Sequence, residues 1–284
     1  MRVQDALQSA VETLSGSTEA GDDPQLVARL LMKDCLKTDS AGLIARSHDS
    51  LSEHEQVRFF EQVELARTTP VFRVIGKRNF HGLDLSLNTA TLEPRDDTEI
   101  LVETVLARLK SLPGGASAPW HFADLGTGTG AVALALLSEL PHAQAALTDL
   151  STDALGMARA NAEQNGLAER CRFLQGSWFA PLEETYDFIV SNPPYIASKM
   201  VDGLDSSVKD HDPRLALDGG MDGLDAYRVL VCGARTYLKP HGFLALEIGY
   251  DQADPVRALA QAAGWTCEGV YHDLAGRDRV LVLL

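Results

Sequence analysis

The 284-residue sequence lacks several features that would each place it in a well-known class of proteins. No apolar run approaches the roughly 20 residues needed to cross a bilayer, and the N-terminus has no apolar stretch typical of a signal peptide. The four cysteines are scattered without a CxxC pair, and the eight histidines form no HExxH motif. These absences predict a cytoplasmic protein with free thiols, no membrane partner and no metal site.

Basic residues are also scarce. The chain has 25 Lys and Arg against 40 Asp and Glu, a formal net charge of −15. Such a chain repels phosphates, so non-specific binding to nucleic acid is disfavoured. Hydrophobic residues make up 45% of the chain, which is normal for a globular protein and too high for a disordered one.

Apolar residues in the first third of the chain recur at helical spacing. Asp23-Pro24 has the pattern of a helix start, and Ser52 with Glu55 has the spacing of a capping box. Residues 1–73 are therefore predicted to form a small helical domain, used for packing or partner recognition. From Val71 to Leu92 the pattern changes to β-branched and alternating residues with glycines, which predicts a β-hairpin linker, assigned to residues 74–93.

Residues 94–284 alternate between strand-like and helix-like segments, which predicts an α/β domain with a mostly parallel sheet and helices on both faces. Seven strands are expected, near residues 122–125, 143–148, 171–174, 187–191, 243–248, 267–271 and 280–283.

A glycine-rich segment, DLGTGTG at residues 124–130, follows the first predicted strand of this domain and precedes a helix. Glycines there let the backbone turn sharply and approach a ligand closely. The next strand ends near Asp149, where an acidic side chain suits the hydroxyls of a ribose. The same pattern fits dinucleotides, so the loop by itself leaves NAD and S-adenosylmethionine both open.

A second segment, Asn192-Pro193-Pro194-Tyr195, follows the strand DFIV. The prolines fix their own φ angles, and Pro193 keeps Asn192 out of the helical region. The result is a rigid segment that offers an amide side chain, free carbonyls and an aromatic ring, a set that can hold a planar –NH2 group.

Together these segments resemble class I S-adenosylmethionine-dependent methyltransferases that act on planar nitrogens. The closer resemblance is to the HemK/PrmC family of release factor glutamine methyltransferases, and it covers nearly the whole chain. The motifs that carry it are TLEPRDDTEILVE (91–103), DLGTGTGAVALAL (124–136), FLQGSWF (173–179), SNPPYI (191–196), ALDGGMDGLDAYR (216–228), LALEIG (244–249) and DLAGRDRV (273–280).

The resemblance implies a Rossmann-like methyltransferase sheet, S-adenosylmethionine as cofactor, and the glutamine of a release factor GGQ loop as substrate. It implies that Asn192, Pro193 and Tyr195 are catalytic and that Pro194 joins them in binding the substrate. It further implies that the cofactor is bound by Gly126, Thr127, Gly128, Thr129, Gly130, Asp149, Trp178 and Asn192.

The sequence departs from the family pattern at Ser177, where an acidic residue is frequent, and at Asp96, where proline is frequent. Arg95, Glu99 and Glu247 are further candidates, each equally well explained as a structural ion pair or strand-end carboxylate. Three alternatives stay open: a nucleic-acid amino-methyltransferase, a ribosomal-protein glutamine methyltransferase, and a binding protein that keeps the fold without catalysis. No basic stripe accompanies the Asn-Pro-Pro-Tyr segment, which favours a protein substrate over nucleic acid.

Overall fold

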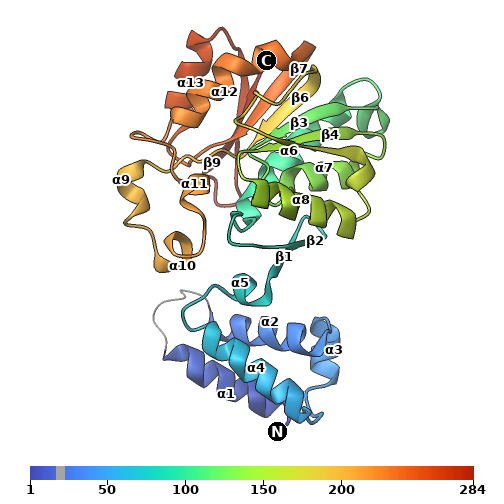
Figure 1. Cartoon of the computed structure of the whole chain (residues 1–284), viewed down its shortest axis with the longest axis vertical. Coiled ribbons are helices and arrows are strands. Elements are labelled where there is room, and N and C mark those ends of the chain that lie inside the picture. The colour runs from blue at the N-terminus through green and yellow to red at the C-terminus, as the bar shows by residue number, and fades with distance from the viewer. Residues whose placement is uncertain (17–22) are drawn as a thin grey trace. The chain divides into compact units, whose positions relative to one another are not determined.

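The structure is a computed structural model that describes residues 1–16 and 23–284. The described chain forms two compact units. One comprises Met1–Lys77 with Leu204–His211, and the other comprises Arg78–Gly203 with Asp212–Leu284. Figure 1 labels many of the helices and strands of both units.

The first unit is helical, as the apolar spacing predicts. Its helices are α1 (Val3–Ser15), α2 (Pro24–Leu36), α3 (Ser40–Ala45), α4 (Glu53–Leu65), α5 (Val71–Ile75) and the short α10 (Ser206–Lys209). The predicted caps are present: Asp23 accepts a hydrogen bond from the Gln25 amide at 3.0 Å, and Ser52 and Glu55 form a capping box. The prediction of β-structure from Val71 onward is wrong for its first five residues, because Val71–Ile75 form α5 and its Val71 side chain packs into the helical core.

The predicted hairpin follows α5 and consists of β1 (Lys77–Phe80) and β2 (Leu83–Ser86). His81 and Gly82 both have positive φ, 47° and 80°, which is the conformation of a two-residue type I′ turn. Phe80 and Leu85 are fully buried in a core cluster of the second unit. The hairpin is thereby anchored beside the elements that form the candidate site.

The second unit contains a seven-stranded sheet of order β5-β4-β3-β6-β7-β9-β8 (Figure 1). Only β9 runs antiparallel to its neighbours, so the predicted mostly parallel sheet is confirmed. The strands are β3 (His121–Leu125), β4 (Gln144–Asp149), β5 (Cys171–Gln175), β6 (Tyr186–Ser191), β7 (Leu238–Glu247), β8 (Cys267–His272) and β9 (Asp278–Leu283).

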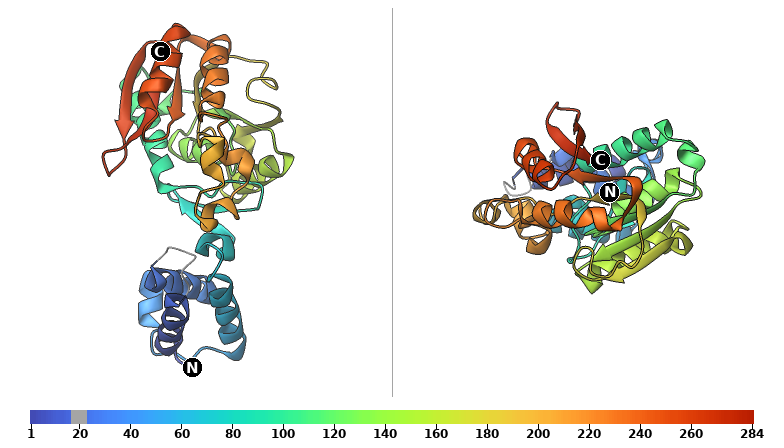
Figure 2. Two further views of the ribbon diagram at one scale, coloured as in Figure 1. Left: turned by 90° about the vertical axis from the view of Figure 1, so that its left-hand side faces the viewer. Right: turned by 90° about the horizontal axis from the view of Figure 1, so that it is seen from above.

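Helices cover both faces of this sheet (Figure 2). On one face pack α6 (Glu99–Ser111), α7 (Ala131–Glu139) and α8 (Thr152–Gln164), and on the other α12 (Asp225–Gly233) and α13 (Ala253–Ala262). Successive strand residues supply the two cores alternately. Phe188 belongs to the first core and Ile189 to the second, as the two-residue period of a strand requires.

Short elements complete the unit: α9 (Ser198–Val201), α11 (Arg214–Leu217) and the 3-10 turns η1 (Asp96–Thr98), η2 (Gly115–Ser117), η3 (Ala168–Arg170) and η4 (Ala234–Tyr237). Helix α12 ends at Gly233, and β7 begins at Leu238, five residues before the strand predicted near residues 243–248. The register of β7 shifts in this stretch, and His241 has a φ of 69°. Because of this irregularity, the early part of β7 lacks the regular alternation of side chains by which a strand is predicted from sequence.

Within residues 1–16 and 23–284, no helix is both long and apolar enough to cross a membrane.

Candidate active site

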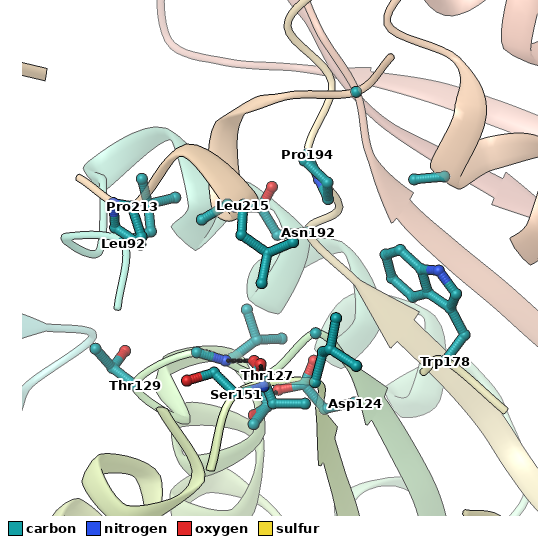
Figure 3. A pocket seen from close by; sticks show the side chains of 18 of the residues that line it. Leu92, Asp124, Thr127, Thr129, Ser151, Trp178, Asn192, Pro194, Pro213 and Leu215 are labelled. Carbon is teal, nitrogen blue, oxygen red and sulfur yellow. Dashed lines mark hydrogen bonds between the residues drawn. The ribbon is translucent and has the colours of Figure 1, made fainter. Parts of the chain in front are cut away.

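A cavity of about 460 Å³ lies beyond the carboxyl ends of β3, β4 and β6, and all its lining residues belong to the second unit. This is where open α/β sheets bind ligands, and the volume falls within the usual range for small-molecule sites. Figure 3 shows Asp124, Thr127 and Thr129 along one side of the cavity, Asn192, Pro194 and Leu215 along the other, and Trp178 at one end.

The glycine loop follows β3 and folds over the end of β4. The amides of Gly126 and Thr127 both donate to the Thr148 carbonyl at 2.9 Å. Gly126, Gly128 and Gly130 have φ values of 72°, 57° and 83°, a region that residues with a side chain rarely adopt. Residues 126–129 line the cavity, whereas Gly130 is buried and is the N-cap of α7.

Asp149 ends β4 and lines the cavity beside this loop. One carboxylate oxygen accepts from the Gly128 amide at 2.9 Å, and the other accepts from the Ser151 amide at 2.9 Å. These two bonds fix the orientation of the carboxylate. Because each carboxylate oxygen has a second lone pair, the group can still accept hydrogen bonds from a pair of ligand hydroxyls.

Asp124 lies beneath the loop and is buried, at 2% exposure. Its carboxylate accepts from the Thr127 hydroxyl at 2.7 Å and from the Ala133 amide at 3.3 Å. Burial raises the pKa of this carboxyl to about 7, against the lowering effect of both hydrogen bonds. The sequence motif contains Asp124, yet only the structure shows that it carries a partly titrated group at the floor of the cavity.

Trp178 has a φ of 50°, an unusual conformation for a bulky residue. Its carbonyl accepts from the Thr148 hydroxyl at 3.3 Å. A methyl group added at Gly126 would lie 3.6 Å from the indole ring, so the ring lies directly against the glycine loop. The strained backbone thus places a flat apolar surface at the end of the cavity.

The Asn-Pro-Pro-Tyr segment leaves the end of β6 and divides its side chains between the cavity and the core. Asn192 and Pro194 line the cavity, whereas Pro193 and Tyr195 do not. Tyr195 packs against the core cluster of the α12 and α13 face, and burial raises the pKa of its hydroxyl. Its carbonyl accepts from Gln252 Nε2 at 2.9 Å, which ties the segment to the N-cap of α13.

A glycine in the loop before α12 permits a close approach to this segment. The Gly219 amide donates to the Ile196 carbonyl at 2.8 Å. A Cβ at Gly219 would lie 2.7 Å from the Pro194 carbonyl oxygen, a distance that real side chains do not tolerate. Residues 218–220 therefore form a wall of the cavity, a role that the sequence motif at 216–228 did not indicate.

The segment before α6 supplies another wall, through Leu92, Pro94, Arg95 and Thr98. Of the two further candidates here, Arg95 lines the cavity and lies 3.6 Å from Asp212, whereas Glu99 does not line it and accepts from the His81 amide at 2.7 Å. The motif at 91–103 was the only sequence signal for this wall.

Among the residues that the structure describes, no group of three or more His, Cys, Asp or Glu side chains is placed to hold a metal ion. The cavity instead combines backbone amides, one well-oriented carboxylate, an indole and an amide side chain.

A parallel sheet with its last strand reversed, a glycine loop after β3 and Asn-Pro-Pro-Tyr after β6 together define a methyltransferase. The chain matches the methyltransferase small domain family over residues 97–210 and the PrmC N-terminal domain over residues 5–76. A solved methyltransferase from Pyrococcus furiosus shares the fold, with a TM-score of 0.52 and 17% identity over 82% of this chain and 98% of that one.

Two curated relatives cover nearly the full chain. The release factor glutamine methyltransferase of Agrobacterium fabrum is 42% identical over 91% of this chain and 90% of its own length. That of Moorella thermoacetica is 42% identical over 98% of this chain and 97% of its own length. The chain belongs to the release factor glutamine methyltransferase family.

Proposed function

We propose that the chain transfers a methyl group from S-adenosylmethionine to the side-chain amide nitrogen of the glutamine in the GGQ loop of peptide-chain release factors, in the cytoplasm. The observation that carries this proposal is the placement of Asn192 at the cavity wall, on the side opposite Thr127 and Thr129 of the glycine loop (Figure 3), in a cavity that Asp149 also lines. A group that recognises a planar amide and a group that suits a ribose thus border the same space.

The residues of the cavity fit the proposed cofactor. The Asp149 carboxylate has lone pairs for the ribose hydroxyls, and the Trp178 ring offers an apolar surface for the adenine. The open glycine loop, where Gly128 has no heavy atom within 4 Å of an added Cβ, leaves room for the methionine part. When bound, S-adenosylmethionine supplies an electrophilic methyl group on a positively charged sulfur.

The proposed work of the chain is to orient the substrate amide. Asn192 Oδ1, which borders the cavity, accepts a hydrogen bond from one of the two amide protons, which turns the nitrogen lone pair toward the cavity. The Pro193 carbonyl, outside the cavity lining, is assigned the second proton only by the family resemblance. An amide nitrogen is a weak nucleophile, so holding it in line with the methyl group provides most of the rate enhancement. Good positioning can lower a barrier by about 7–11 kcal/mol. Tyr195 is proposed to support the segment from beneath, where it packs against the core.

The helical residues 1–73 are proposed to recognise the release factor, with residues 74–93 as the linker and 94–284 as the catalytic domain. The net charge of −15 supports a protein substrate over a nucleic acid, since phosphates would be repelled. The ribosomal-protein and nucleic-acid alternatives use the same chemistry and are separated by experiment.

The test is methyl transfer from labelled S-adenosylmethionine to a purified release factor. Label should appear on the intact release factor and disappear when its GGQ glutamine is replaced by alanine. Asn192→Ala should abolish transfer. Asn79→Ala serves as the matched control, because Asn79 is exposed on the hairpin and contacts only Asp84 among the contacts described for its side chain. Label that ignores the glutamine, or that goes to DNA or a ribosomal protein instead, would overturn the proposal.

A further inference from the structure

Glu247 is a buried carboxylate that lies outside the cavity but beside Asn192. It is the last residue of β7 and is 2% exposed. Strand β6 pairs with β7 in parallel, and Ser191 of β6 lies opposite Leu246 of β7. The next residues, Asn192 and Glu247, therefore leave adjacent parallel strands at the same edge of the sheet.

The surroundings of Glu247 leave its charge only partly compensated. Among the described residues, its Oε2 atom has no hydrogen-bond partner. The Arg279 guanidinium is shared with Asp97 at 3.0 Å and Asp273 at 3.1 Å. Burial raises the pKa of Glu247 to about 7. The charged and titratable groups that face it are Arg279, Arg95, Asp97 and the hydroxyls of Tyr195 and Tyr227.

The side chain of Thr98 connects this carboxylate to the cavity. Its hydrogen bond to the Glu247 carboxyl lowers the pKa of that group, against the raising effect of burial. Its Oγ1 accepts from Asn192 Nδ2 at 3.2 Å. Thr98 ends the 3-10 turn before α6 and lines the cavity. Three residues from three separate segments therefore form one chain of hydrogen bonds.

The direction of these hydrogen bonds follows from the number of protons. An ionised carboxylate only accepts, so the single hydroxyl proton of Thr98 goes to Glu247. The lone pairs of Thr98 Oγ1 are then left for a donor, and Asn192 offers one at Nδ2. If the Asn192 amide were flipped, its Oδ1 would face an oxygen with no proton to give.

We propose that Glu247, acting through Thr98, is a positioning residue that holds the Asn192 amide with its oxygen available to the substrate. The inference rests on the proposed function, because it assumes that Asn192 Oδ1 accepts from the substrate –NH2 group. Glu247 touches neither the cavity nor the substrate. Its effect is to select one of the two orientations of an amide that are nearly equal in shape.

Protonation of Glu247 removes this selection. A neutral carboxyl can donate to Thr98, whose own proton is then free to point at the Asn192 side chain and favour the flipped amide. With a pKa of about 7, the ionised fraction falls about tenfold between pH 8 and pH 6. Turnover should fall by the same factor.

The experiment measures kcat and KM for methylation of a release factor from pH 6 to pH 8.5. Thr98→Val should lower kcat at least tenfold with the KM for the release factor within about threefold, and Thr98→Ser should restore most of kcat. Glu247→Gln should lower kcat and lose the decline toward pH 6. Thr104→Val is the matched control, because Thr104 is a buried threonine of α6 that does not line the cavity. This control should keep both kcat and the pH profile.

Calorimetric binding of S-adenosylhomocysteine confirms that each variant retains a folded cofactor site, independently of turnover. Wild-type kcat and a wild-type pH profile in Glu247→Gln would overturn the inference, as would full activity in Thr98→Val or no recovery in Thr98→Ser. A wild-type chain that fails to methylate the release factor would instead overturn the proposed function, and the inference with it. The wild-type reaction thus distinguishes the two failures.

Discussion

Asn161 offers a sharp test of how the hairpin, α8 and the glycine loop are held together. It is fully buried in α8. Its Oδ1 accepts from the Ser86 amide at 2.7 Å, and its Nδ2 donates to the Ser86 carbonyl at 3.1 Å and to the Thr129 carbonyl at 2.9 Å. One side chain thus bonds an edge of β2 and a cavity-lining residue of the loop.

Asn161→Ala removes these three hydrogen bonds and leaves one amide and two carbonyls with no replacement from the side chain. Each lost hydrogen bond lowers the free energy of unfolding by about 1 kcal/mol, and by more where a buried group stays unpaired, so the total loss is about 3–5 kcal/mol. Alanine recovers roughly 0.5 kcal/mol through its higher helix propensity. The free energy of unfolding should therefore fall by about 2.5–4.5 kcal/mol, as measured by urea denaturation with linear extrapolation.

Two further variants separate hydrogen bonding from simple loss of volume. Gln164→Ala, three residues further along α8, removes an exposed bond to the Asp84 carbonyl of 2.8 Å and should change stability by less than about 1 kcal/mol. Asn161→Asp keeps the shape but places a carboxylate oxygen against two carbonyl oxygens, so it should destabilise at least as much as alanine. If Asn161→Ala costs no more than Gln164→Ala, or if Asn161→Asp is tolerated, the reasoning is wrong.

Three other predictions follow from the cavity. Asn192→Ala should reduce turnover at least 100-fold while calorimetry shows S-adenosylmethionine affinity within about threefold of wild type. The reason is that the proposed function assigns this side chain to the substrate amide, although the family resemblance also implies a cofactor contact. A parallel loss of turnover and affinity would contradict that assignment. Gly128→Val should weaken S-adenosylmethionine binding at least tenfold, because valine is strained at a φ of 57°, and unchanged affinity would refute the loop assignment. The buried Asp124 has a pKa raised from 3.8 to about 7, so the folded state binds more protons than the unfolded one between these values. The contribution of Asp124 to stability is complete below about pH 4 and is lost as pH rises toward 7, by up to about 4 kcal/mol. Asp124→Asn should therefore reduce the difference in the free energy of unfolding between pH 5 and pH 8, as measured by urea denaturation. An unchanged difference would contradict the raised pKa of Asp124.

Much of the fold was predictable because local and global preferences agree. Strand-like and helix-like segments alternate at regular intervals, and the seven strands predicted from them are the seven strands of the sheet. Local capping agrees with the fold as well, since the Ser151 hydroxyl caps α8 by accepting from the Ala154 amide at 3.2 Å. The sequence prediction is wrong where tertiary packing overrides the local pattern. In α5, a segment with several β-branched residues forms a helix that packs against the core of the first unit.

Part of the candidate site was predictable for a similar reason. A glycine loop and an Asn-Pro-Pro-Tyr segment, each directly after a strand of one parallel sheet, must meet at the carboxyl edge of that sheet. The sequence by itself therefore determined which motifs share the cavity.

Only the tertiary structure decided which side chains of those motifs reach the cavity and what surrounds them. Asn192 and Pro194 border it, whereas Pro193 and Tyr195 do not. The wall at Gly219, the Asn161 bridge and the link from Glu247 through Thr98 each join segments that are far apart along the chain. No local pattern encodes such contacts, because burial, hydrogen-bond direction and pKa depend on which distant residues the packed fold brings together.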